Sequence, residues 1–104
     1  MKEKMISDLL VRLNFTISSI GFKYWIDAIK IYNPKEHIKI ETLYHDIAGR
    51  NNTTRQRVER AMRTARIRAD KELYKEFNYN QKLSNKVILL LLVSNYNICG
   101  NIND

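Results

Sequence analysis

The chain has 104 residues, a net charge of +7 and a pI near 9.7, so we expect a single domain with an anionic partner: DNA, RNA or an acidic membrane surface. Its longest apolar run, Val87 to Val93, is far shorter than the roughly 20 residues that span a bilayer, which excludes a membrane-spanning helix. The single cysteine, Cys99, excludes an intramolecular disulfide and favours a reducing cytoplasm.

Apolar residues recur at helical spacing along the chain, and no segment alternates as a paired strand would. We therefore predict an all-α fold of about six helices. Pro34 should close the second helix, because proline lacks an amide donor and disfavours helix at the residue before it. The predicted helices cover residues 6–13, 19–32, 41–49, 54–69, 71–77 and 85–96, and residues 97–104 form a frayed tail.

The third and fourth predicted helices are joined by a short polar turn, Gly49 to Asn52. Thr53 should cap the fourth helix, with Gln56 completing a capping box. Ala48 at the fifth position of the pair, Asn52 at the ninth and Val58 at the fifteenth fit a helix-turn-helix, whose second helix enters the DNA major groove.

The fourth helix has an apolar stripe on one side and arginine on the other. Stepping about 100° per residue from Val58 places Ala61, Met62, Ala65 and Ala69 together, with Arg60, Arg63 and Ile67 opposite. Seven of the eight arginines lie between Arg50 and Arg68, whereas the ten lysines are scattered. A solvated basic helix is the simpler alternative, but guanidinium groups make bidentate contacts to guanine edges and phosphates that ammonium groups cannot. The pattern favours nucleic-acid binding.

These residues carry a family resemblance that covers most of the chain. The blocks Asp46-Ile47-Ala48, Asn52-Thr53-Thr54 and Arg57-Val58-Glu59-Arg60-Ala61, with Ile20-Gly21-Phe22-Lys23-Tyr24 upstream, resemble the C-terminal effector domain of the sporulation stage zero protein A, a response regulator of sporulation. The resemblance implies a transcription regulator that binds specific double-stranded DNA sequences, with copies side by side through the last helix. The chain differs from the family at two positions: Asn51 stands where the family has an apolar residue, and Thr64 stands where the family has a histidine.

By position, the resemblance implies that Arg57, Glu59 and Arg60 read base edges and that Arg63 and Thr64 lie along the groove. A carboxylate at Glu59 could accept a hydrogen bond from cytosine N4, or it could pair with Arg55 or Arg63, four residues away on either side. The DNA-contacting set that we predict is Asn52, Thr53, Thr54, Arg55, Gln56, Arg57, Glu59, Arg60, Arg63, Thr64, Arg66 and Arg68.

The last predicted helix is apolar beyond one stripe, so part of it should meet a second protomer, with Ile88, Leu91 and Leu92 as the expected contacts. An alternative function follows from this helix: a protein-interaction module that antagonises a full-length relative. Another alternative is replication or copy control on a plasmid or phage. The family places its effector domain behind a receiver domain, and we expect a stand-alone regulator slightly more than a fragment.

We find no residues arranged for catalysis, so we expect neither an enzyme nor a small-molecule substrate. His37 and His45 lack cysteine or carboxylate neighbours at ligand spacing, so we expect surface histidines and no metal or other cofactor. The N-terminus, with charges among its apolar residues and no small-residue cleavage site, is not a secretory signal. We expect a cytoplasmic, nucleoid-associated protein that forms dimers on DNA.

Overall fold

The computed structural model describes residues 2–36 and 38–96, and all regular structure in these residues is helical. The helices are α1 (Lys2–Arg12), α2 (Ile20–Ile31), α3 (Ile40–Arg50), α4 (Arg55–Phe77) and α5 (Asn85–Tyr96), with a 3-10 turn, η1 (Pro34–Glu36), between α2 and α3. The predicted all-α class is confirmed. No helix in the described part of the chain is long and apolar enough to cross a membrane. The predictions for His37, Cys99 and the tail fall outside the described residues.

An asparagine residue with a left-handed backbone conformation follows the end of three of the helices. Asn14, Asn52 and Asn78 have φ angles of 74°, 52° and 48°, a region that asparagine tolerates better than most residues. A capping side chain marks the start of α2: Ser19 Oγ accepts a hydrogen bond from the Phe22 amide at 3.2 Å, as the predicted start of this helix requires. The ends of these helices and the start of α2 are therefore determined by residues close by in the sequence.

The fourth and fifth predicted helices are one continuous helix, α4. No glycine or proline separates the two predicted segments, and an ion pair between Arg66 and Asp70 at 3.3 Å spans the expected break. Ala69 and Leu73, both 0% exposed, continue one buried stripe across it. The real end of the helix is Asn78, whose amide donates to the Tyr74 carbonyl.

Helix α1 begins at Lys2, four residues before its predicted start. The prediction rested on apolar spacing, which does not reveal a polar first turn. Lys4 Nζ lies 3.0 Å from Asp8 Oδ2 on this exposed part of the helix, in the i, i+4 arrangement that supports a solvated helix.

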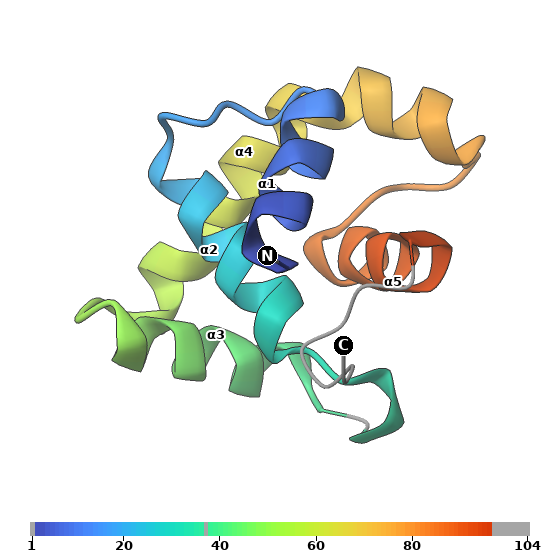
Figure 1. Ribbon diagram of the computed structural model, residues 1–104. Coiled ribbons are helices and arrows are strands. Elements are labelled where there is room, and N and C mark those ends of the chain that lie inside the picture. Colours follow the sequence, from blue (N-terminus) through green and yellow to red (C-terminus); the bar gives the residue numbers. More distant parts are fainter. Residues whose placement is uncertain (1, 37, 97–104) are drawn as a thin grey trace.

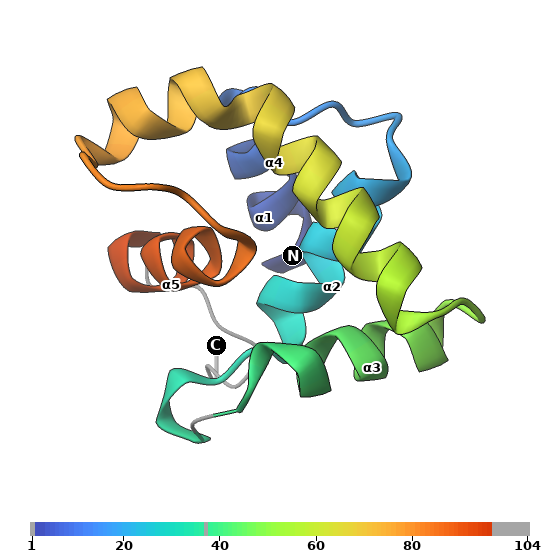
Figure 2. The ribbon, with the colours of Figure 1, turned by 180° about the vertical axis from the view of Figure 1, so that it is seen from behind.

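Helix α2 lies at the centre of the molecule and contacts α1, α3, α4 and α5. Figure 1 shows α3 below α2 and α5 to one side of it. Figure 2, which views the molecule from behind, shows α4 crossing in front of α2. The core fills the space between these helices, and its largest fully buried side chains are Trp25, Ile6, Leu10, Leu13, Ile29, Leu43, Ile47, Met62, Leu73, Ile88, Leu89 and Leu92.

Candidate nucleic-acid interface

Helices α3 and α4 form the helix-turn-helix that the sequence predicts. Asn52 has the left-handed conformation at the turn, and the following amide, of Thr53, donates to the Ala48 carbonyl at 3.0 Å. Ala48 and Val58, the two positions that must pack, are 5% and 0% exposed. Gly49 and Arg50 belong to the last turn of α3, so the connection to α4 is Asn51 to Thr54, which has the predicted length but begins two residues later than predicted.

The N-cap of α4 is Thr54, one residue later than predicted. Its Oγ1 accepts a hydrogen bond from the Arg57 amide at 3.2 Å, and its backbone is extended, as an N-cap requires. Thr53 is instead part of the turn, because its own amide is bonded back to α3. The capping box with Gln56 is therefore corrected to a single cap by Thr54.

Helix α4 turns its arginine-rich side away from the core. Val58 and Met62 are 0% exposed and anchor the inner face, as the periodicity predicts. Ile67 is 54% exposed on the opposite side, so that side is open to solvent along several turns. Of the predicted contact residues, Thr53 and Glu59 are half-buried, and those exposed are Asn52, Thr54, Arg55, Gln56, Arg57, Arg60, Arg63, Thr64 and Arg68.

Arg66 is the exception, because only 8% of it is exposed. Its Nε donates to Asn85 Oδ1 at 3.0 Å, and one of its terminal nitrogens pairs with Asp70 at 3.3 Å. Asn85 Nδ2 in turn donates to the Tyr44 hydroxyl at 3.1 Å, which joins α3, α4 and α5 through one buried polar network. Arg66 therefore does not belong to the exposed set, and, contrary to the prediction from the sequence, we do not expect it to contact DNA.

The arginines on the exposed side differ in their partners. Arg55 Nε lies 3.7 Å from Glu41 Oε1 of α3, and Arg63 Nε lies 3.6 Å from Glu59 Oε2. The pairing of Glu59 with Arg63 is thus one of the two alternatives that the sequence left open. Arg57, Arg60 and Arg68 have no carboxylate within 4.0 Å among residues 2–36 and 38–96.

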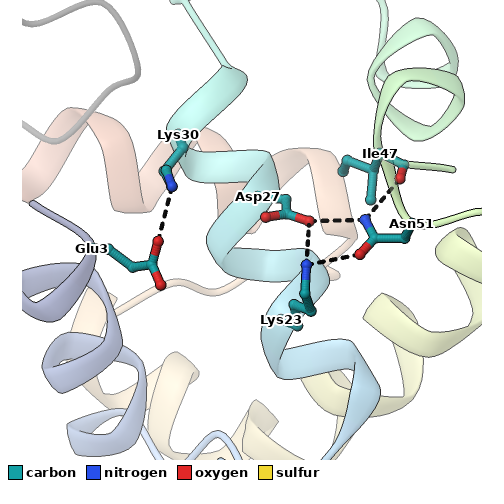
Figure 3. Close-up of polar contacts among 6 residues, drawn as sticks. All are labelled: Glu3, Lys23, Asp27, Lys30, Ile47 and Asn51. Atoms are coloured by element: carbon teal, nitrogen blue, oxygen red, sulfur yellow. Dashed lines mark hydrogen bonds and ion pairs between the residues drawn. The ribbon is translucent and has the colours of Figure 1, made fainter. Parts of the chain in front are cut away.

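Helix α2 holds the turn in place through polar contacts that the sequence did not reveal. Figure 3 shows Asn51 Nδ2 donating to Asp27 Oδ2 at 2.9 Å and to the Ile47 carbonyl at 2.8 Å. Lys23 Nζ donates to Asn51 Oδ1 at 2.8 Å. Asn51 was recognisable only as a polar residue at an apolar family position, and its partners on α2, Asp27 and Lys23, lie 24 and 28 residues earlier in the chain.

The predicted dimer contacts lie mostly inside the protein. Ile88 and Leu92 are both 0% exposed and pack in the core, so in this fold they cannot meet a second copy. Leu91 is half-buried and Leu90 is 37% exposed. Helix α5 is apolar on several sides, so its sequence could not show which side faces the core.

The described residues hold no group of three or more His, Cys, Asp or Glu side chains close enough to bind a metal ion. His45 is exposed, as expected. A family model described as sporulation initiation factor Spo0A C terminal matches residues 6–87 of the chain. Comparison with curated proteins and with solved structures gave no significant match.

Proposed function

The chain belongs to the family of sporulation initiation factor Spo0A C-terminal domains, and on that premise we propose that it binds specific duplex DNA sequences with α4 in the major groove. The family comprises DNA-binding effector domains of a sporulation regulator and is not a family of enzymes. The residue pattern behind the earlier resemblance lies within the matched residues.

One observation carries the proposal: the arginine side of α4 is exposed and follows directly after a helix-turn-helix turn. A major groove about 12 Å wide admits an α-helix whose outer side chains reach base edges. Arg60 is exposed and has no carboxylate partner among the described residues, so its guanidinium is available to a guanine edge. We assign base reading to Arg57, Glu59 and Arg60, and groove contacts to Arg63 and Thr64.

The pair between Glu59 and Arg63 gives the acid a defined place in this helix. At 3.6 Å the guanidinium of Arg63 limits the repulsion between the carboxylate and DNA phosphates. Because the Glu59 side chain is still 36% exposed, its carboxylate can accept from cytosine N4 while it keeps this neighbour.

A second copy on an adjacent site is part of the proposal, but its contacts must differ from those first predicted. The aliphatic residues of α5 that remain at least partly exposed are Val87, Leu90 and Leu91. Leu91→Asp should therefore weaken cooperative binding to paired sites and leave binding to a single site unchanged. Equal cooperativity in both proteins would reject this contact.

Selection of bound sequences from a random duplex pool tests the main proposal. We expect one enriched sequence, with binding that falls steeply as salt rises because phosphate contacts release counterions. Binding without any enriched sequence would reject specific recognition. Binding that does not change with salt would reject the arginine surface as the contact.

A further inference from the structure

A groove of about 350 Å³ runs between the beginning of α2 and the outer side of α4. Ile20 and Gly21 form its wall on α2, and Ala61 and Ala65 form its apolar floor on α4. Arg57, Arg60, Thr64 and Arg68 also line this groove, which we call the α2–α4 groove. Among the residues that the structure describes, none that lines it is acidic, so its charged side chains are all positive.

The other side of α4 has a different charge pattern. There, a groove of about 530 Å³ between α3 and α4 includes Arg55 and Arg63, but Glu41 and Glu59 line it too. Each of these acids pairs with one arginine, at 3.7 Å and 3.6 Å. Arg60 lines both grooves and therefore stands on the ridge between them. A polyanion next to α4 is thus attracted more strongly to the α2 side than to the α3 side.

The groove residues on α4 also have a suitable spacing. Thr64 and Arg68 follow Arg57 by 7 and 11 residues, which are whole numbers of helical turns to within about 20°. At about 1.5 Å per residue, Arg57 and Arg68 lie about 16 Å apart along the axis. This row could contact two or three consecutive phosphates, with the Thr64 hydroxyl as a further donor between the two guanidinium groups.

We propose that the α2–α4 groove holds the phosphodiester backbone of one DNA strand while Arg60 on the ridge reaches the bases. This inference rests on the proposed function and extends the interface beyond the helix-turn-helix pair to the beginning of α2. In this placement Arg57 contacts a phosphate and not a base edge, which changes the role proposed for it above, and Thr64 and Arg68 contact the neighbouring phosphates. The sugars pack on Ile20 and the small floor residues. Helix α4 consequently enters the major groove of the DNA in one orientation, with the beginning of α2 against one DNA strand.

An acid placed in the α2 wall tests the groove directly. Ile20 is 59% exposed at the first position of α2, where a glutamate is compatible with the helix dipole, so Ile20→Glu should fold. We expect it to bind duplex DNA at low salt roughly tenfold more weakly than Ile20→Gln, with a smaller difference at high salt. Val11→Glu, with the same change in charge at a site 48% exposed on α1, should lose much less.

A second pair of variants removes positive charge from the same helix. Arg68→Gln should make the slope of log affinity against log salt concentration less steep, by about the amount that one phosphate contact contributes. The preferred DNA sequence should not change. Lys71→Gln, three residues further on and outside the groove, should leave the slope nearly unchanged. Circular dichroism checks the fold of each variant.

The outcomes separate the two claims. If Ile20→Glu matches Val11→Glu and Arg68→Gln matches Lys71→Gln while the wild-type protein still selects a sequence, the backbone placement is wrong and the proposed function stands. If the wild-type protein shows no salt-dependent binding to any duplex, both claims are wrong.

Discussion

The indole Nε1 of Trp25 lies 3.0 Å from the backbone carbonyl oxygen of Met62 and donates a hydrogen bond to it. Both residues are 0% exposed, so the bond joins the middle of α2 to the first half of α4 inside the core. Buried hydrogen bonds of this kind cost more to break than exposed ones, because neither group can turn to water. This bond therefore holds the inner side of α4 against α2, while the outer side of α4 faces solvent.

Gly21 should be indispensable at the crossing of α2 and α4. A Cβ atom there would lie 2.3 Å from the Ala61 carbonyl oxygen and 2.9 Å from Ala65 Cβ, so the helices would have to separate. We expect Gly21→Ala to lower the free energy of unfolding by about 1–3 kcal/mol in urea denaturation. Gly49→Ala is the control, because a Cβ there meets nothing within 4 Å, and it should stabilise by about 0.5–1 kcal/mol. Similar effects at both sites would contradict the close packing.

Arg66 should matter for stability and not for DNA binding. Arg66→Met leaves the Oδ1 atom of Asn85 without its buried donor, so we expect a loss of about 1–3 kcal/mol in unfolding free energy. The salt dependence of DNA binding should be unchanged below the unfolding transition. Arg68→Met, on the exposed side, should show the reverse pattern. A reduced salt slope in Arg66→Met would mean that this residue contacts phosphate after all.

The side of α4 on which Arg66 lies could not be predicted from the local sequence. Eight residues after Val58, it lies about 80° from the centre of the buried stripe, at the border between the two sides. Its partner Asn85 lies 19 residues further along the chain and the next member of the network, Tyr44, belongs to α3. Only the tertiary packing decides that its side chain turns inward.

The features that were predictable are those fixed by neighbours in the chain. The left-handed Asn52, the buried Val58 and the exposed Arg60 follow from turn chemistry and helical period. The contacts of Asn51 with Asp27 depend on how α2 packs against α3, and the burial of Ile88 depends on which side of an almost wholly apolar helix faces the core. Neither leaves a local pattern.

Tyr44 should make the fold sensitive to high pH. Burial raises the pKa of its phenol above the ordinary value of 10.0, because the charged form is poorly solvated in the core. Since the folded-state pKa is the higher one, the stability from the neutral phenol is complete below pH 10 and is lost as pH rises through the folded-state pKa.

Unfolding of Tyr44→Phe in urea at a series of pH values checks this effect. The variant should lose about 1 kcal/mol at neutral pH, because the Asn85 amide loses an acceptor. Above pH 10 the gap between wild type and variant should narrow. A gap that stays constant through this range would show that the phenol does not titrate differently in the folded state.

Glu41 should restrain Arg55 before DNA arrives. The pair is separated by 3.7 Å and both side chains are at least half exposed, so its loss should change stability by less than about 1 kcal/mol. Glu41→Gln should raise duplex affinity about two- to fivefold in a direct titration, because Arg55 becomes available and an acid is removed. Glu36→Gln on η1 is the control for net charge. If the gain persists in an Arg55→Gln background, the pairing is not its cause.

The exposed position of Arg60 is the central claim, and its substitution by alanine is the most direct test. The affinity of wild type and Arg60→Ala should be measured for the selected duplex and for a scrambled duplex at the same salt concentration. The account predicts a loss of about 1–3 kcal/mol on the selected duplex, a much smaller loss on the scrambled one, and so a flatter discrimination. Equal losses on both duplexes, or none on either, would contradict base reading by this surface.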